Sequence, residues 1–404
     1  MTDGIFRPMS TNRRQFMLQG AAAAASLMSI NSFAKAQQSV QTGLAEVFRQ
    51  DFQIGTALSN KTLVENDSAL LSIVAREFNA ITTENALKWS EIHPEPGVWN
   101  FAPVDNFVEF GRAHNMQMVG HTFMWHRQTP AQLFSETIQQ VDHCNSCHSY
   151  QKATSKKALL SALETHTTTV LDRYKKDIYT WDVANEVFED DGQWRESEWY
   201  KIIGSNMLEY AFRFAREAHP KSCLIYNDYH VEKPKKYASI IEKLDAVQKK
   251  GVKVDGVGIQ CHIKVDQNSP SLKDLETAIV ALSQSGYRVH ITELDIDVLP
   301  NAWEHKGRHV NELTDKNELN PYTNALPPSI SQQLSERYRS VFELFIKHRD
   351  KIDRVSFWGT TDDESWKNGL PIAGRTSYPL LFDRKKQPKP AYFAVKNLRA
   401  APTP

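Results

Sequence analysis

The sequence has no excess of charge of either sign, and this argues against two classes of function. Its 404 residues include 48 Lys plus Arg and 48 Asp plus Glu, so the formal net charge at pH 7 is zero. Proteins that bind nucleic acid or an anionic membrane usually present a strongly basic surface. We therefore expect no nucleic-acid partner, and a neutral substrate fits this balance better than a charged one.

Long apolar runs, linkers and cysteines are also scarce. No apolar run is long enough to cross a bilayer, which predicts a protein without a membrane span. No stretch rich in Ser, Gly or Pro divides the chain into modules, so we expect one domain. Only four cysteines are present, and Cys223 and Cys261 fall in predicted strands, where we expect buried free thiols.

Apolar and aromatic residues are plentiful. Apolar residues make up 41% of the chain, which is enough for a sizeable core, and aromatic residues make up 10%, with nine Trp. Sugar rings are commonly bound by stacking on such side chains, although Trp is also a common core residue. The composition is therefore compatible with a globular protein that binds sugars.

The N-terminus resembles a twin-arginine export signal. Arg13 and Arg14 precede a short, moderately apolar run, and Ala34-Lys35-Ala36 follows as a small-x-small cleavage site. The apolar run is interrupted by polar residues and is too short to span a bilayer. We expect residues 1–36 to be a removable signal, residues 37–404 to be the folded domain, and the protein to be secreted or periplasmic.

Short apolar runs alternate with longer helical patterns from Val40 onward, which is typical of repeated strand–helix units around a parallel sheet. Apolar residues at three- and four-residue spacing predict helices over Val104–Ala113, Lys157–Tyr174, Trp199–Ala218, Lys236–Lys249, Leu272–Ser283 and Ile330–His348. Eight strands are predicted near Phe52–Ala57, Glu77–Thr82, Met116–Thr122, Ile178–Val183, Cys223–Asn227, Val254–Gln260, Tyr287–Thr292 and Arg354–Trp358. Eight such units predict a single-domain α/β protein, a (β/α)8 TIM barrel, whose functional site lies after the carboxyl ends of the strands.

Two of these strands end in a glutamate. The run from Ile178 leads to Asn185 and Glu186, and the run from Tyr287 leads to Glu293. Most glutamates are solvated surface groups, but a glutamate that directly follows a buried run is costly unless it has a use. Two carboxylates at the ends of two core strands are what acid/base or nucleophilic cleavage of a glycosidic bond requires.

Other chemically active residues follow the remaining strands. Seven of the eight predicted strand ends carry such residues, which are His, Asn, Gln, Lys, Asp, Glu, Tyr and Trp. A single strand-end His or Trp is more often structural than functional. Convergence of this many at one end of a barrel predicts a site there.

At these residues the chain resembles glycoside hydrolase family 10, the β-1,4-xylanases. The matching motifs are Thr-x-Glu-Asn-x-x-Lys from Thr82, Gly-His-Thr-x-x-Trp-His from Gly120, Trp-Asp-Val-x-Asn-Glu from Trp181, Gln-x-His from Gln260, Ile-Thr-Glu-Leu-Asp from Ile291 and Phe-Trp-Gly from Phe357. They occur in the family's order between about Phe52 and Ala394. The resemblance implies a monomeric retaining endo-β-1,4-xylanase that acts on xylan or xylooligosaccharides and needs no cofactor and no metal.

The resemblance also implies roles for individual residues. Glu186 would be the general acid/base and Glu293 the nucleophile, with their carboxyl groups about 5 to 5.5 Å apart. We expect the negative charge of Glu293 to raise the pKa of Glu186, and His262 and Asp295 to orient Glu293, unless these two form only a structural pair. The implied substrate-binding residues are Glu84, Asn85, Lys88, His121, Trp125, Asn185, Tyr229, Gln260, His262, Trp358 and Trp366, of which Tyr229 would stack on the leaving-group side.

Two rival functions keep the same architecture. A relative that prefers β-1,4-glucan or aryl glycosides would differ only in whether the pocket admits a C6 hydroxymethyl group. A non-hydrolytic xylan-binding protein would have no use for a paired acid and nucleophile, so the presence of both glutamates argues against it.

Two inserts depart from or extend the pattern. Glu136–Ser155 contains Cys144 and Cys147 between two histidines, where we expect a disulfide or a reduced pair rather than zinc or an attached haem. Trp303–Pro328 is a long polar connection after the nucleophile strand. It is expected either to wall the cleft or to be a packed surface loop.

Overall fold

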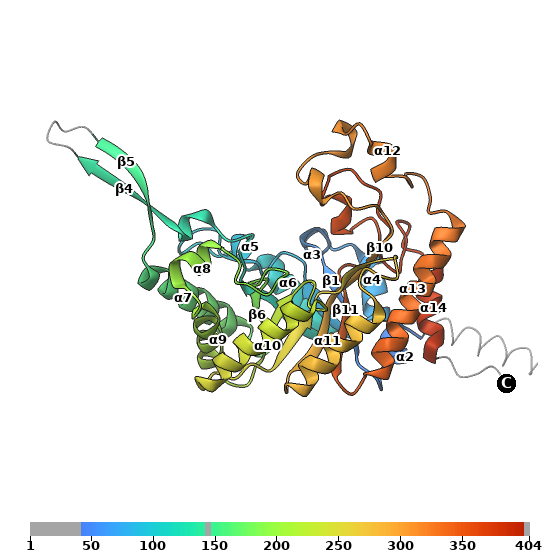
Figure 1. Ribbon diagram of the computed structural model, residues 1–404, viewed down its shortest axis with the longest axis horizontal. Helices are drawn as coiled ribbons and strands as arrows, with labels where there is room; N and C mark the ends of the chain where they lie inside the picture. Colours follow the sequence, from blue (N-terminus) through green and yellow to red (C-terminus); the bar gives the residue numbers. More distant parts are fainter. Residues whose placement is uncertain (1–41, 142–146, 400–404) are drawn as a thin grey trace, which may run out of the picture. The chain divides into compact units, whose positions relative to one another are not determined.

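The computed structural model describes residues 42–141 and 147–399, with side chains outside 136–151, and in this part of the chain eight parallel strands close into a barrel (Figure 1). Neighbouring strands pair in the order β11-β1-β2-β3-β6-β7-β8-β10, and β10 pairs with β11 to complete the ring. The predicted TIM barrel is therefore confirmed. The strands are β1 (Gln53–Leu58), β2 (Ala80–Thr83), β3 (Gln117–Met124), β6 (Ile178–Asn185), β7 (Cys223–Asp228), β8 (Gly256–Ile259), β10 (Arg288–Asp297) and β11 (Ile352–Phe357).

Helices surround the ring, and their first residues explain where several begin. Ser155 and Ser271 accept a hydrogen bond from the backbone N–H three residues later and so cap α7 and α11. Proline stands in the first turn of α6, α10, α13 and α14, where no N–H partner is needed. The helices are α2 (Leu44–Val47), α3 (Asn60–Glu65), α4 (Ser68–Glu77), α5 (Trp89–Ile92), α6 (Ala102–Ala113), α7 (Lys156–Tyr174), α8 (Glu198–Ile203), α9 (Met207–Ala218), α10 (Pro234–Lys249), α11 (Leu272–Gln284), α12 (Lys316–Leu319), α13 (Pro328–Lys347) and α14 (Pro390–Lys396), with short 3-10 turns η1 (Ala131–Leu133), η2 (Trp303–His305), η3 (Val310–Glu312), η4 (Trp366–Asn368) and η5 (Asn397–Arg399).

Three sequence predictions about these elements were wrong. The helix expected over Trp199–Ala218 is two helices, α8 and α9, because Gly204 between them has φ +82°, which a helix does not allow. The second strand begins later than expected, because Glu77 is the last residue of α4. Cys261 lies between β8 and the short strand β9 (His262–Lys264), with φ +61°, and not in a strand.

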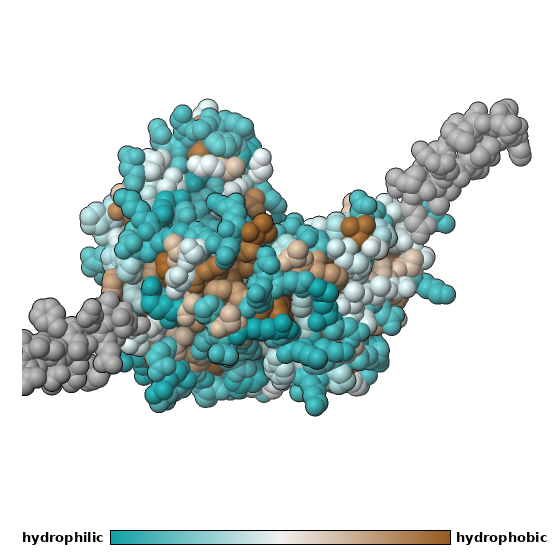
Figure 2. All heavy atoms as spheres, turned by 180° about the vertical axis from the view of Figure 1, so that it is seen from behind, coloured by the Kyte–Doolittle hydropathy of each residue, from teal (hydrophilic) through white to brown (hydrophobic). Residues whose placement is uncertain are grey.

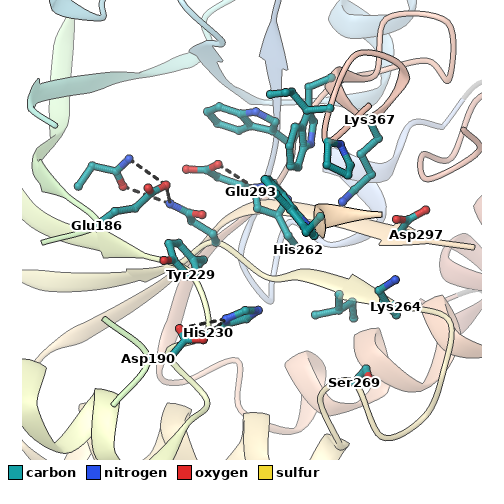
Figure 3. Close-up of a pocket in the computed structure, with 18 of the residues that line it drawn as sticks. Glu186, Asp190, Tyr229, His230, His262, Lys264, Ser269, Glu293, Asp297 and Lys367 are labelled. Carbon is teal, nitrogen blue, oxygen red and sulfur yellow. Dashed lines mark hydrogen bonds and ion pairs between the residues drawn. The ribbon is translucent and has the colours of Figure 1, made fainter. Parts of the chain in front are cut away.

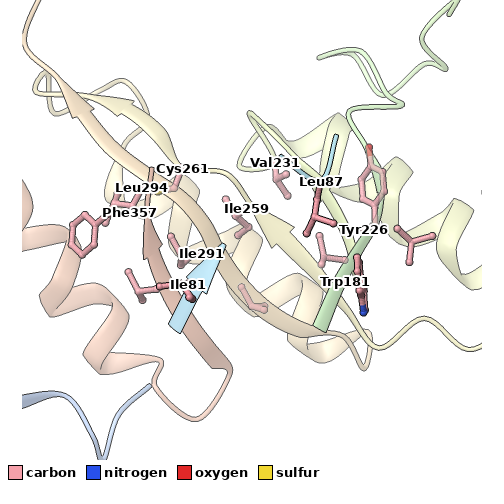
Figure 4. Close-up of a cluster of buried hydrophobic side chains, with 14 of the residues drawn as sticks. Ile81, Leu87, Trp181, Tyr226, Val231, Ile259, Cys261, Ile291, Leu294 and Phe357 are labelled. Carbon is pink, nitrogen blue, oxygen red and sulfur yellow. The ribbon is translucent and has the colours of Figure 1, made fainter. Parts of the chain in front are cut away.

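Large apolar side chains fill the interior of the barrel and the layer between its strands and helices (Figure 4). Ile81, Ile291 and Phe357 lie in this core on three different strands and are about 1% exposed or less. Gly120 in β3 shows how tight the packing is, because a Cβ there would stand 1.9 Å from a ring carbon of Trp181. Both cysteines in the barrel are free, as predicted, with Cys261 buried and Cys223 partly exposed.

The segment with the other two cysteines forms an antiparallel hairpin of β4 (Ser135–Val141) and β5 (Cys147–Ala153), which the sequence did not predict. It projects away from the barrel on the side where α7 and α8 lie (Figure 1). Cys144 lies outside the described residues, and the Cys147 side chain is not described. The expected disulfide or reduced pair therefore stays a prediction.

The connection after β10 is a folded unit. Within it, η2, η3 and α12 enclose a small apolar cluster of Ala302, Val310, Leu313, Leu319 and Ile372, separate from the main core. Both expectations for Trp303–Pro328 hold in part, because the loop is packed and its first residue also lines the cavity described below.

The face shown in Figure 2 is mostly hydrophilic, interrupted by separate apolar patches. In the two described stretches of the chain, no helix is both long enough and apolar enough to cross a membrane.

Candidate active site

A cavity of about 930 Å³ opens at the carboxyl ends of the barrel strands, where the sequence predicted a site (Figure 3). Of the predicted site residues, all but Asp295 line this cavity, and Asp295 is fully buried directly behind His262. Because the ring of parallel strands turns every strand end towards the same rim, residues up to about 280 positions apart in the sequence, such as Glu84 and Trp366, meet in one place.

Glu186 directly follows β6, and neutral donors hold both of its carboxylate oxygens. Its Oε1 accepts a hydrogen bond from Gln260 Nε2 at 3.0 Å, and its Oε2 accepts one from Trp125 Nε1 at 2.9 Å. Its backbone N–H donates to Asn227 O at 3.0 Å. His126 Nδ1 lies 4.0 Å from Oε2. The side chain is 12% exposed, so it is accessible from the cavity yet fixed in direction.

Glu293 lies within β10 and is held by a different set of groups. Asn227 Nδ2 donates to its Oε1 at 2.8 Å, and His262 Nε2 lies 3.1 Å from its Oε2. The other ring nitrogen of His262 is 2.9 Å from Asp295 Oδ2, which also accepts a hydrogen bond from Trp366 Nε1 at 2.8 Å. Glu293, His262 and Asp295 thus form a chain that runs from the cavity into the core.

Asn185 connects the two glutamates. Its Oδ1 accepts hydrogen bonds from Asn227 Nδ2 at 3.1 Å and from Gln260 Nε2 at 3.2 Å. These are the amides that also donate to Glu293 and Glu186. The orientation of Asn227 is fixed in turn by Thr292, whose hydroxyl donates to Asn227 Oδ1 at 2.6 Å. The two carboxylates are therefore oriented by one shared set of buried amides.

The pKa of Glu186 lies below its ordinary value, so the expectation that Glu293 raises it was wrong. Burial is the largest influence and favours the neutral acid, but hydrogen bonds from Gln260 and Trp125 and the charges of His126 and Arg127 together outweigh it. The sequence indicated both donors as site residues but could not show that they contact Glu186, because Gln260 follows β8 and Trp125 follows β3.

The pKa of His262 is shifted in the opposite direction, upwards. Burial alone would keep its imidazole neutral, but Asp295 and Glu293 outweigh burial and raise the pKa of His262 to about 9. The pKa of Asp295 stays below its ordinary value despite burial, because His262 and Lys367 are close. At neutral pH a cation therefore faces Glu293. His262 and Asp295 pair with each other, and His262 also contacts Glu293. A structural role for this pair and a role in orienting Glu293 therefore do not exclude each other.

A second group of polar residues follows β2. Lys88 is 6% exposed, and its Nζ donates to Asn85 Oδ1 at 3.0 Å and lies 4.7 Å from the centre of the Trp125 ring. Burial lowers the pKa of Lys88 and raises that of Glu84, although each group partly offsets the shift of the other. On β3, His121 Nδ1 is 2.8 Å from the buried carboxylate of Asp182. These side chains offer directed donors and acceptors to a neutral, hydroxyl-rich ligand.

Several residues of the site were missed by sequence reasoning. Asn227, which orients Glu293, is fully buried and does not itself line the cavity, and the sequence indicated it only as the last residue of the fifth predicted strand. Arg195 comes from the irregular segment after β6 and has no periodic signal. The cavity is also lined by His126, Arg127, Gln128, Asp190, Arg195, His230, Glu232, Lys233, Lys264, Asn268, Ser269, Asn301, Trp303, Lys367 and Arg375, most of them on loops whose path the sequence does not reveal.

Comparisons with known proteins agree with this geometry. Residues 43–398 match the family described as Glycosyl hydrolase family 10. Endo-1,4-beta-xylanase A of Xylanibacter ruminicola is 35% identical over 351 residues, which covers 87% of this chain and 91% of that protein. An endo-1,4-beta-xylanase of Geobacillus stearothermophilus is 35% identical over 88% of this chain and 98% of its own length. The solved structure of a GH10 endoxylanase from a sugarcane soil metagenome aligns with a TM-score of 0.79 and 43% identity, over 89% of this chain and 99% of that one. The chain therefore belongs to glycosyl hydrolase family 10.

Proposed function

We propose that this protein is a retaining endo-β-1,4-xylanase that hydrolyses internal xylosidic bonds of xylan. The observation that carries the proposal is the pair formed by Glu186, directly after β6, and Glu293, within β10, which shared amides orient in one large cavity. The names of the similar proteins support xylan as the substrate. An open cavity of this size fits a polymer segment better than a single sugar.

In the first half-reaction, Glu293 attacks the anomeric carbon and displaces the leaving oxygen, which takes the proton of Glu186. A glycosyl-enzyme ester and a shortened xylan chain result. The pKa of Glu186 lies below its ordinary value in the free protein, and we propose that bound substrate favours its protonated form. A bound sugar excludes water from the cavity and so disfavours the carboxylate form of Glu186.

In the second half-reaction, Glu186 removes a proton from water, and the water oxygen attacks the anomeric carbon of the ester. Glu293 leaves as a carboxylate, and the sugar is released with its original β-configuration. The ester has by then removed the negative charge of Glu293, and Glu186 enters this step ionised and able to act as a base.

The remaining predicted residues are proposed to bind the sugars. Asn185 would donate to the 2-hydroxyl beside the cleaved bond, with His121, Lys88, Gln260 and Trp358 around the same ring. Glu84, Asn85 and Trp366 would hold the next sugar towards the non-reducing end, and Tyr229 the sugar on the leaving-group side. Trp125 and His262 would act mainly through the two glutamates, to which they are hydrogen-bonded.

Reducing ends released from soluble xylan and from carboxymethylcellulose test the substrate. Xylan should be cleaved and carboxymethylcellulose left nearly intact, whereas binding to xylan without cleavage would mean a sugar-binding protein. Proton NMR of early xylooligosaccharide hydrolysis tests the mechanism. The β-anomer should form first, and an α-anomer first would exclude double displacement.

We further propose that residues 1–36 direct export through the twin-arginine route. Their paired arginines and small-x-small site support this proposal. Fractionation of cells that make the full chain should place the protein outside the cytoplasm. Replacing both arginines by lysine, R13K with R14K, should retain it inside, and unchanged export would refute the route.

A further inference from the structure

Arg195 contacts both the backbone of Glu186 and the aromatic residue predicted for the leaving-group side. Its Nε donates to Glu186 O at 2.9 Å, and its Nη2 donates to Tyr229 Oη at 2.6 Å and to Phe188 O at 3.3 Å. Its Nη1 forms an ion pair with Glu189 at 3.0 Å, and the side chain is only 17% exposed. One rigid guanidinium thus joins three groups on the segment after β6 to Tyr229, which follows β7.

The contact to Glu186 has a particular value because of the backbone there. Glu186 has φ +55°, in the left-handed region that side chains other than glycine rarely adopt. Such a conformation persists only where surrounding groups hold it. Its N–H is held by Asn227 O, and the next N–H, of Val187, by Tyr226 Oη at 3.1 Å. Arg195 holds the carbonyl between them, and the direction of the carboxylate depends on all three contacts.

Tyr229 is held by the same arginine and by a buried lysine. Lys236 Nζ lies 3.8 Å from the centre of the Tyr229 ring, and Lys236 is fully buried and paired with Asp228 at 2.8 Å. The ring lines the cavity while its hydroxyl is bound by Arg195. Tyr229 and Glu186 therefore lie at two ends of one hydrogen-bonded connection (Figure 3 shows the two residues in the cavity).

We propose that Arg195 is a positioning residue that keeps the carboxyl group of Glu186 in line with the leaving oxygen and ties it to the sugar stacked on Tyr229. The proposal rests on the proposed function, because it assumes that Glu186 protonates a leaving sugar. It follows that the rate lost on replacing Arg195 should be larger for leaving groups that depend more on protonation by Glu186. A purely structural arginine would affect all substrates alike.

Aryl β-xylobiosides separate these cases. For Arg195→Met, the rate of glycosyl-enzyme formation from a phenyl xylobioside, whose leaving group needs a proton, should fall about 10- to 100-fold. With a dinitrophenyl xylobioside, which departs unprotonated, that rate, taken from the pre-steady-state burst, should fall less than about threefold. The slope of log kcat/KM against leaving-group pKa should become steeper.

Three further variants complete the experiment. Arg195→Lys keeps the charge but lacks the planar fork, so it should restore only part of the phenyl xylobioside rate, and it replaces Arg195→Met if that variant does not fold. Tyr229→Phe removes the hydroxyl group that Arg195 binds and keeps the ring, so it should steepen the same slope, but less than Arg195→Met does. Arg213→Met is the matched control, because Arg213 also pairs with a glutamate, Glu209 at 2.7 Å, on α9 away from the cavity.

The outcomes are distinct. Equal loss on both aryl substrates, with a slope like that of the wild type, would overturn the proposal, and so would a slope change as large in Arg213→Met. Failure of the proposed function would be seen in the wild-type protein itself, which would then cleave neither xylan nor the aryl xylobiosides.

Discussion

The two glutamates differ in the kind of group that holds them. Glu293 within β10 faces His262, a cation at neutral pH, which is itself held by the buried Asp295. Glu186 at the end of β6 is held by two neutral donors, the Gln260 amide and the Trp125 indole. A fixed cation suits a group that must remain a carboxylate until it forms a bond. Neutral donors suit a group that gains and loses a proton in each cycle.

The largest effect is expected at Glu293. Glu293→Ala removes the attacking atom, and no leaving group compensates for a missing nucleophile in a covalent mechanism. Turnover of xylan and of dinitrophenyl xylobioside should both fall by at least about 10⁴-fold. Steady-state rates and the absence of a burst would check this, and a retained burst would contradict the assignment.

Glu186→Ala should slow the cleavage of substrates whose leaving group needs a proton much more than that of substrates whose leaving group does not. Its rate on xylan should fall by about 10²- to 10⁴-fold, because the leaving oxygen departs without a proton. Dinitrophenyl xylobioside should still form the glycosyl-enzyme and show a burst followed by a slow steady rate, since the base for hydrolysis is missing too.

Added azide sharpens this result, because it attacks the ester without needing a base. It should accelerate the steady rate of Glu186→Ala and should do nothing by the same route in Glu293→Ala, which forms no ester for azide to attack. If azide had no effect on the first variant, the two assignments would have to be exchanged or the double displacement abandoned.

His262 should make stability depend on pH. Its pKa is raised from 6.5 to about 9 in the folded protein, so the stabilisation from its proton is complete below about pH 6.5 and is lost as the pH rises through 9. The difference in free energy of unfolding between the wild type and His262→Gln, from urea denaturation, should shrink over that interval. A difference that does not change with pH would show that His262 is neutral.

His166 provides a control of opposite sign. Burial holds its pKa well below 6.5, so the folded protein favours the neutral ring, which stacks on Trp89 at 3.9 Å. The contribution of His166 is present above pH 6.5 and is lost as the pH falls. The destabilisation caused by His166→Gln should therefore shrink towards low pH, where that caused by His262→Gln is complete.

The smallest expected effect concerns the indole that holds Glu186. Trp125→Phe removes the donor at Oε2 and should raise the pKa of Glu186. The alkaline limb of kcat/KM should move up by about one pH unit or less. Trp303→Phe, elsewhere on the cavity wall, should leave that limb in place. A shift to lower pH in Trp125→Phe would contradict the contact.

The positions of both glutamates could be predicted from the sequence, because they depend on patterns within short stretches of the chain. Alternating buried runs locate β6 and β10, and the residues that follow them must lie at one rim because all strands of the ring are parallel. The hydrogen-bond partners of Glu186 could not be predicted in this way. Its donors Gln260 and Trp125 lie more than 60 residues away in opposite directions, and only their three-dimensional arrangement shows that they lower its pKa.

The segments missed share a physical cause. Arg195 lies in a segment whose path depends on non-periodic contacts, such as the bridge between Phe188 and Trp194. The β4–β5 hairpin is polar on both strands, so no alternation marked it. The break at Gly204 was visible as a glycine, but the helical periodicity on both sides of it obscured its effect.

The hairpin has a consequence for engineering. Ser135 and Ala153 are paired directly, so the chain leaves the barrel and returns to it at one point, and β4 and β5 pair with each other and take no part in the closed ring. A segment attached in this way can be exchanged or lengthened without changing the register of any barrel strand. The site is therefore a natural position for splicing in a second module, such as a polysaccharide anchor, within the same polypeptide.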